Sequence, residues 1–195
     1  MVQIDTKKIT VFLLVVLFIL FPQTCFLQSN SHPFKDDEFV GPFPSWINIK
    51  TTYKLKGNGK SDETAGIQAA LNSIGNSTST ATVLYLPAGT YRITKTLTCN
   101  NKINVSFIGA DPANTEIIWD GDNGGTMLQI DGTAYSRFNR ISYDGKGKAS
   151  IAIDQSWKGV DPYFDTGNEY ADNIFSDVNI GIRGGGAGHG FAEIS

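Results

Sequence analysis

The sequence predicts an all-β solenoid of stacked coils with a single helix ahead of the first coil. From Val83 onward, apolar segments of roughly three to six residues recur at intervals of about ten to thirteen residues, nearly always followed by Gly, Asp or Asn. This spacing fits a sandwich or barrel as well as a solenoid. The solenoid is favoured because the segments FIGAD, IWDG, QIDG and SYDG all run from an apolar residue into a similar turn.

The predicted helix covers about residues 62–74. Asp62 is a suitable N-cap, Glu63 favours the positive end of the helix dipole, and Gly75 supplies the stop. The apolar positions follow helical spacing: Ile67, Ala70, Leu71 and Ile74. Since a solenoid has an open, edge-like end, we expect this helix to cap it.

The N-terminal segment is typical of a signal peptide covering residues 1–29. Lys7 and Lys8 precede an apolar run from Ile9 to Phe21, which is shorter than the roughly 20 residues that a spanning helix needs. If the apolar segment continues through Leu27, a membrane anchor is the alternative. We therefore expect a secreted or cell-surface protein, with an exposed lead-in over residues 30–45.

The remaining residues, 46–195, are predicted to form one domain, the N-terminal part of a longer β-solenoid. Trp46–Ile49 and Tyr53–Leu55 have the composition of short strands. The sequence stops after a strand-like segment without a closing helix, so the solenoid is expected to be truncated after its first coils. A net charge of −3 gives no strong field for nucleic acid, which we exclude as a partner.

The stretch Gly57–Ser61 has some features of a phosphate-binding loop. Gly59, Lys60 and Ser61 match the end of that motif, but Lys54 stands where its first glycine belongs. Two acidic residues follow and would repel phosphate at the helix start. The stretch is therefore interpreted as a glycine-rich turn before a helix.

Three segments carry a family resemblance: GNGKSDETAGIQAALN (57–72), VLYLPAGTYRITKTL (83–97) and NVSFIGAD (104–111). They resemble the N-terminal signature of the pectate lyase superfamily, right-handed parallel β-helix proteins that include polygalacturonase-like enzymes and phage tailspikes. The resemblance implies a right-handed parallel β-helix with an N-terminal capping α-helix. It also implies an extracellular pectin-type polysaccharide as substrate or ligand.

Two sets of residues follow from this fold. The interior is expected to hold stacked apolar side chains: Val105, Phe107, Ile118, Leu128, Ile141 and Val178. Sugar rings pack on exposed aromatic residues, and the irregular stretch DQSWKGVDPYFDTGNEYAD offers Trp157, Tyr163 and Tyr170 as carbohydrate-binding candidates. The alternative for these aromatic residues is a packed surface loop.

Cleavage of a polysaccharide requires either two carboxyl groups for hydrolysis or a base for β-elimination, often with Ca²⁺. Carboxylates are dense in one span: Asp154, Asp161, Asp165, Glu169, Asp172 and Asp177. We select Asp172 and Asp177 as candidate catalytic carboxylates. Solenoid turns are also rich in Asp, so a turn role is the alternative. No metal site is predicted, and Ca²⁺ is expected only for a lyase.

His189 is selected as an auxiliary acid, base or substrate donor. It lies in Gly188-His189-Gly190, which resembles a motif on the catalytic face of polygalacturonases, although the other three motifs of those enzymes are absent. The sequence thus predicts a polysaccharide hydrolase or lyase. A non-catalytic carbohydrate-binding or adhesion protein at the cell surface remains the alternative.

Overall fold

The computed structural model describes residues 41–75, 82–157, 165 and 167–186. All of them belong to the compact unit Gly41–Ser195. Among these residues, no helix has the length and apolar character needed to cross a membrane. The predicted signal peptide and most of the lead-in lie outside the described residues, so those assignments stay predictions.

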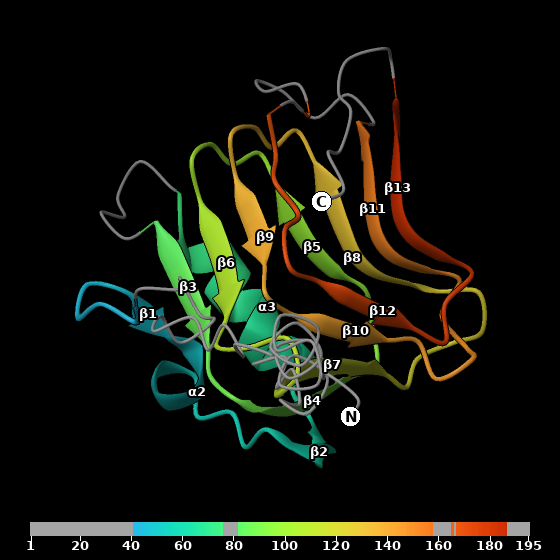
Figure 1. Ribbon diagram of the computed structural model, residues 1–195, viewed down its shortest axis with the longest axis horizontal. Helices are drawn as coiled ribbons and strands as arrows, with labels where there is room; N and C mark the ends of the chain where they lie inside the picture. Colours follow the sequence, from blue (N-terminus) through green and yellow to red (C-terminus); the bar gives the residue numbers. More distant parts are fainter. Residues whose placement is uncertain (1–40, 76–81, 158–164, 166, 187–195) are drawn as a thin grey trace, which may run out of the picture. The chain divides into compact units, whose positions relative to one another are not determined.

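The described strands form three parallel sheets that wind around one core, as Figure 1 shows. Sheet A has the order β1-β3-β6-β9, sheet B the order β12-β10-β7-β4-β2, and sheet C the order β13-β11-β8-β5. Three complete coils, β3–β5, β6–β8 and β9–β11, each contribute one strand to each sheet in turn. This is the predicted right-handed parallel β-helix.

The elements have the following bounds: β1 Ile47–Asn48, α2 Ile49–Thr52, β2 Asn58–Asp62, α3 Thr64–Ser73, β3 Val83–Leu86, β4 Gly89–Ile93, β5 Leu97–Asn100, β6 Ser106–Gly109, β7 Thr115–Trp119, β8 Thr126–Asp131, β9 Arg137–Asn139, β10 Ser142–Asp144, β11 Ile151–Trp157, β12 Ile174–Ser176 and β13 Ile180–Gly186.

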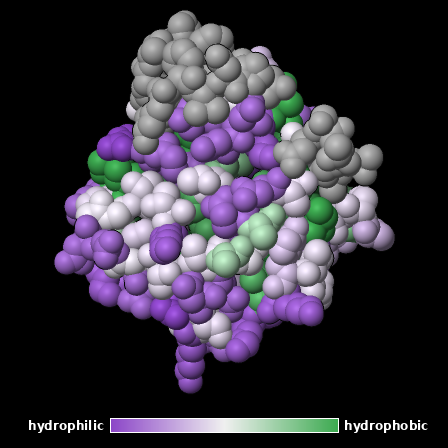
Figure 2. All heavy atoms as spheres, turned by 180° about the vertical axis from the view of Figure 1, so that it is seen from behind, coloured by the Kyte–Doolittle hydropathy of each residue, from purple (hydrophilic) through white to green (hydrophobic). Residues whose placement is uncertain are grey.

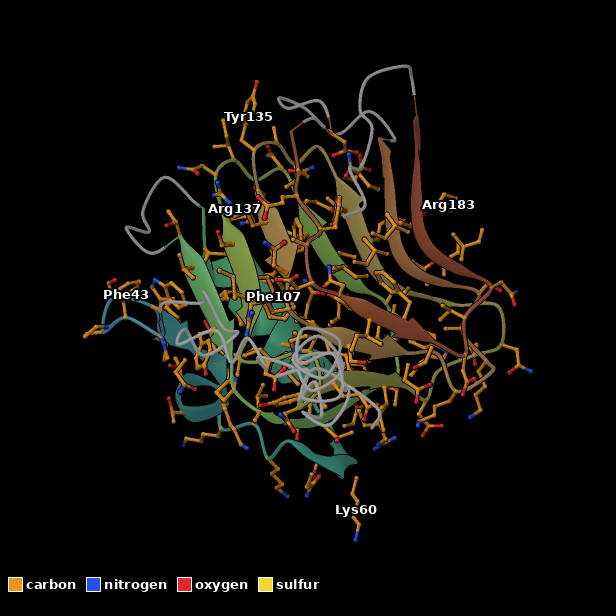
Figure 3. The ribbon with its side chains drawn as sticks, viewed as in Figure 1. Phe43, Lys60, Phe107, Tyr135, Arg137 and Arg183 are labelled. Atoms are coloured by element: carbon orange, nitrogen blue, oxygen red, sulfur yellow. The ribbon has the colours of Figure 1, made fainter. Side chains whose placement is uncertain are left out.

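The core consists of columns of side chains, because parallel pairing places equivalent residues of successive coils on top of each other. In sheet B, Tyr91 pairs with Ile117 and Ile117 with Tyr143. The Tyr143 ring in turn stacks on Phe175, with 5.9 Å between ring centroids. In sheet A, Leu84, Phe107 and Phe138 form a second column, and Figure 3 shows Phe107 inside the coils.

Four of the six predicted interior residues are buried: Val105, Phe107, Leu128 and Ile141. Ile118 is only partly buried, whereas its neighbour Ile117 is fully buried. The sequence alone does not show which of these two adjacent isoleucines points inward. The pairing of Ile117 with the buried Tyr91 shows that it is Ile117. Val178 is partly buried and packs against the core.

Helix α3 covers the free edge of β5, where sheet C begins (Figure 1). The Gln68 side chain pairs with this edge as a strand backbone would: its Nε2 donates to the Thr98 carbonyl at 2.9 Å, and its Oε1 accepts from the Thr98 amide at 2.8 Å. The buried face of α3 carries Ile67, Ala70 and Leu71. The helix therefore caps both the edge and the core, as the sequence predicted.

The glycine-rich stretch before α3 is a structural motif and not a phosphate loop. Residues Asn58–Asp62 form β2, which pairs with β4. The buried Glu63 carboxylate accepts hydrogen bonds from the amides of Lys56 and Gly57 at 3.0 and 3.3 Å. Gly89 must lack a side chain, because a Cβ there would lie 2.9 Å from the Gly57 carbonyl oxygen.

The strand predicted at Tyr53–Leu55 does not form. Asn48 accepts a hydrogen bond from the Thr51 amide at 3.2 Å and so begins the one-turn helix α2. Lys54 then takes a positive φ of 57°, and the Leu55 amide returns to the Lys50 carbonyl at 2.9 Å. Local side-chain capping thus outweighs strand propensity at this point.

Replacing Gln68 by alanine should lower the free energy of unfolding by roughly 1 to 3 kcal/mol, because the Thr98 amide and carbonyl lose their partner. Urea denaturation followed by circular dichroism measures this change. Lys95→Ala, at an exposed residue outside this contact, serves as the control and should change stability by less than about 0.5 kcal/mol. Equal effects of the two substitutions would contradict the edge-pairing role.

Candidate functional site

The two carboxylates selected from the sequence, Asp172 and Asp177, lie on either side of β12 in exposed turns. Both have positive φ angles, 55° and 51°. Asp172 Oδ2 lies 3.9 Å from an Arg140 guanidinium nitrogen, and the Asp177 carbonyl accepts from the Gly147 amide at 3.1 Å. Within the described residues no hydrogen bond or ion pair joins the two carboxylates, and both occupy turn positions. Their catalytic role stays a prediction.

Tyr170 is not available as a sugar-binding surface, which corrects the prediction for this residue. Its side chain is only 1% exposed, and its ring stacks on Phe138 with 5.7 Å between centroids. The phenol donates a hydrogen bond to the Gln155 side chain. Tyr170 therefore extends the core column of sheet A.

Tyr163 and His189 lie outside the described residues. The backbone of Trp157 ends β11 and pairs with Gly186 of β13. The Gly188–Gly190 motif thus follows directly along the chain from the last strand of sheet C.

A different set of polar residues gathers on the outer side of sheet C. Leu128 and Ile130 alternate inward along β8, so Gln129 and Asp131 project the other way. Pairing between strands then aligns an outer row: Thr98, Gln129, Asp154 and Arg183. Within this row, Gln129 Nε2 donates to the Asp154 carbonyl at 2.9 Å.

Arg183 binds Asp154 with both branches of its guanidinium. Its Nε donates to Asp154 Oδ1 at 2.9 Å, and a terminal nitrogen donates to Oδ2. Hydrogen bonding to Asp154 raises the pKa of Arg183. The Asp154 side chain is 2% exposed, whereas the Arg183 side chain is 47% exposed, pointing to the outer side of β13 in Figure 3. The arrangement holds Asp154 as a charged carboxylate.

Asp165 supplies a carboxyl group whose surroundings favour the protonated form. It is buried, its Oδ1 accepts from the Thr133 amide at 2.8 Å, and its Oδ2 has no hydrogen-bond partner in the described structure. Burial raises the pKa of Asp165 to about 6, with further contributions from the charges of Asp131 and Asp154. This group therefore retains its proton at a higher pH than a free carboxyl group and is half protonated near pH 6.

An arginine-bound carboxylate on the outer side of sheet C thus interacts electrostatically with a carboxyl group, Asp165, whose pKa is about 6. A carboxylate held by an arginine and a carboxyl group with a raised pKa can divide the base and acid roles of one reaction. All three carboxyl groups, of Asp131, Asp154 and Asp165, are buried in this conformation. No group of three or more His, Cys, Asp or Glu side chains that could hold a metal ion occurs among the described residues.

Asp154 and Asp165 belong to the acidic span noticed in the sequence, but the sequence did not single them out. Their proximity to Asp131 depends on the coil register, in which Asp154 pairs with Gln129 two positions before Asp131. Only the number of residues per coil, about 25 between Gln129 and Asp154, could have indicated from the sequence that these residues lie close together. That spacing is irregular: Thr98 pairs with Gln129, 31 residues later.

A sequence profile of the rhamnogalacturonase A/epimerase, pectate lyase-like family matches residues 46–156, more than half of the chain. The chain belongs to this family. The matched region includes Asp131 and Asp154 of the candidate site but ends before Asp165 and Arg183. Among curated proteins, no sequence matches.

Two solved structures are similar to this pectate lyase-like chain. ORF18 of Geobacillus virus E2 has 24% sequence identity and a TM-score of 0.54, over 66% of this chain and 25% of the viral protein. The Agl-KA catalytic domain has 14% identity and a TM-score of 0.49, over 79% of this chain and 35% of that domain. The chain therefore spans about a quarter to a third of these structures, and the viral protein supports the fold alone.

Because the pKa of Asp165 is raised, the free energy of unfolding of this protein should depend on pH in a specific way. A folded-state pKa of about 6, against 3.8 for the free residue, stabilises the fold fully below about pH 4, and this contribution disappears as the pH rises through 6. Asp165→Asn removes the titration. Between about pH 4 and 7, the wild type should lose roughly 1 to 3 kcal/mol of unfolding free energy relative to this variant. Urea melts at several pH values measure the difference, and parallel pH profiles would contradict it.

The Asp154–Arg183 pair should contribute to stability because one partner is buried. Arg183→Ala leaves the Asp154 carboxylate without this partner and should cost about 2 kcal/mol by urea denaturation. Adding Asp154→Asn should recover part of this loss. The control is Arg137→Ala, whose ion pair with Glu169 is about half exposed at both partners and should contribute under about 1 kcal/mol. A loss no larger than the control would contradict the assignment.

Proposed function

We propose that the protein is exported and degrades an extracellular pectin-type polysaccharide, by hydrolysis or β-elimination, on the outer side of sheet C. Membership of the pectate lyase-like family supports a polysaccharide as substrate. The observation that carries the site is the electrostatic interaction of Asp165, whose pKa is raised to about 6, with Asp154, which is bound by Arg183. The apolar segment at residues 9–21 supports export.

Hydrolysis assigns complementary roles to the two groups. Asp165 would donate its proton to the glycosidic oxygen, and the Asp154 carboxylate would activate water or attack the sugar carbon. Because Asp165 is buried, the sugar chain can reach it only if this corner of the structure opens. Arg183, about half exposed beside Asp154, can bind a carboxylate or hydroxyl group of the incoming sugar.

One specific observation favours the second candidate function, a non-catalytic carbohydrate-binding protein. All three carboxyl groups near sheet C are closed to solvent, and buried polar groups of this kind also stabilise corners of a β-helix. Under this alternative, the outer side of the coils binds a polymer without cleaving it. An activity measurement separates the two functions.

The test measures reducing-sugar release and absorbance of unsaturated uronates on polygalacturonate, rhamnogalacturonan, alginate and β-glucan, with and without Ca²⁺. It uses this chain and the longest expressed form of the protein. If the proposal holds, Asp154→Asn and Asp165→Asn each reduce the rate by about a hundred-fold or more, while Asp122→Asn, at an exposed carboxylate between β7 and β8, retains it. Absorbing product indicates β-elimination, and non-absorbing product hydrolysis.

Binding of a polymer without product from either form would support the non-catalytic alternative. Product formation that survives Asp154→Asn and Asp165→Asn would place the catalytic groups elsewhere in the protein. Neither binding nor product on any polymer would contradict both functions.

A further inference from the structure

Tyr135 occupies a corner position that is costly for an aromatic residue. The turn between sheet C and sheet A repeats in successive coils, and its equivalent residues are Asn104, Tyr135 and Gly167, with φ angles of 53°, 51° and 63°. The equivalence follows from the Asn104 amide donating to the Ala134 carbonyl and the Ser136 amide donating to Asn168 Oδ1. Glycine and asparagine suit this left-handed conformation, whereas a bulky side chain is strained in it.

Hydrogen bonds among the described residues do not account for a tyrosine here. Two other long side chains with positive φ, Arg140 and Lys146, form ion pairs with aspartates, whereas Lys54 forms none among the described residues. Tyr135 is 59% exposed, and its hydroxyl has no hydrogen bond within the described part of the chain. A strained residue that the fold does not need indicates a role outside the fold.

The surroundings keep the ring at the surface. A Cβ at position 167 would lie 2.7 Å from the Tyr135 ring, so Gly167 leaves room for the ring to lie against the next coil. Figure 3 shows Tyr135 pointing away from the body of the coils, at the end of the molecule where Arg137 also lies. The ring is therefore supported from below and open to solvent.

Polar groups continue from this ring along the outer side of sheet A. Arg137 and Asn139 lie two and four residues after Tyr135, on the side of β9 opposite the buried Phe138. The Arg137 side chain is 52% exposed and pairs with Glu169, which also accepts from the Asn139 amide group at 2.7 Å. An aromatic platform followed by guanidinium and amide donors fits a sugar, whose C–H face stacks on the ring while its hydroxyl groups accept hydrogen bonds.

We propose that Tyr135 is a stacking platform for a pyranose ring of a polysaccharide, which makes the corner between sheets C and A a carbohydrate-binding site distinct from the outer side of sheet C. The proposal rests on the proposed function, because it takes the polymer as the ligand.

The structure provides a matched variant that removes the ring without straining the backbone. Tyr135→Asn introduces the residue found at the equivalent position 104 and should leave the melting temperature unchanged or raise it. Its affinity for polygalacturonate and for β-glucan oligosaccharides, measured by titration calorimetry, should fall about ten-fold for whichever of these the wild type binds. Tyr135→Phe keeps the ring and should retain the wild-type affinity within about two-fold.

Other outcomes overturn the proposal and separate it from the proposed function. If the wild type binds a glycan and Tyr135→Asn binds it equally well, the Tyr135 site is wrong while the polysaccharide function stands. If Tyr135→Asn loses stability together with affinity, the ring has a structural role. If the wild type binds no glycan, both the site and the polysaccharide function are wrong.

Discussion

In-register parallel pairing between coils is the constraint on which the rest of this structure depends. It places each inward side chain on its counterpart in the next coil. A polar side chain in such a column therefore needs a hydrogen-bond partner from a neighbouring inward residue. The column of Cys99, Ile130 and Gln155 shows this, because the third member is polar and buried. Tyr170 donates its hydroxyl to Gln155, and the Gln155 amide donates to the Asp165 carbonyl at 3.1 Å. The buried Gln155 side chain thus gives the hydroxyl group of Tyr170 a hydrogen-bond partner inside the core.

Backbone pairing stops at the corners, and side-chain amides continue it there. Asn168 accepts from the Ser136 amide and donates to the Thr133 carbonyl at 2.7 Å. Asn173 does the same at the next corner, accepting from the Ile141 amide and donating to the Phe138 carbonyl. Because these amides hold successive corners in register, an exposed residue on a corner, such as Tyr135, is carried on a fixed support.

The sequence predicts the fold well because the information for it is local. The cap helix has its stop signal and apolar stripe within one short stretch, and Glu63 and Gly89 belong to a recognisable signature. The sequence predicts the site poorly because its members meet only through the coil register. Four segments that end alike, such as those around Trp119 and Ile130, were expected to turn one common corner. They lie at different corners, since Trp119 ends a strand of sheet B and Ile130 belongs to sheet C.

Burial gives Asp165 a property that places a condition on any chemistry at this site. Its pKa is raised because water is excluded from it, so admitting bulk water would lower the pKa again and release the proton. An opened, hydrated corner is therefore a poor acid at neutral pH. Under the proposed function, Asp165 keeps its proton only if the substrate excludes water from it as the closed corner does. A polymer that covers the corner would exclude more water than a single sugar. The same burial that hides Asp165 in this conformation thus favours a polymer over a monosaccharide as the substrate.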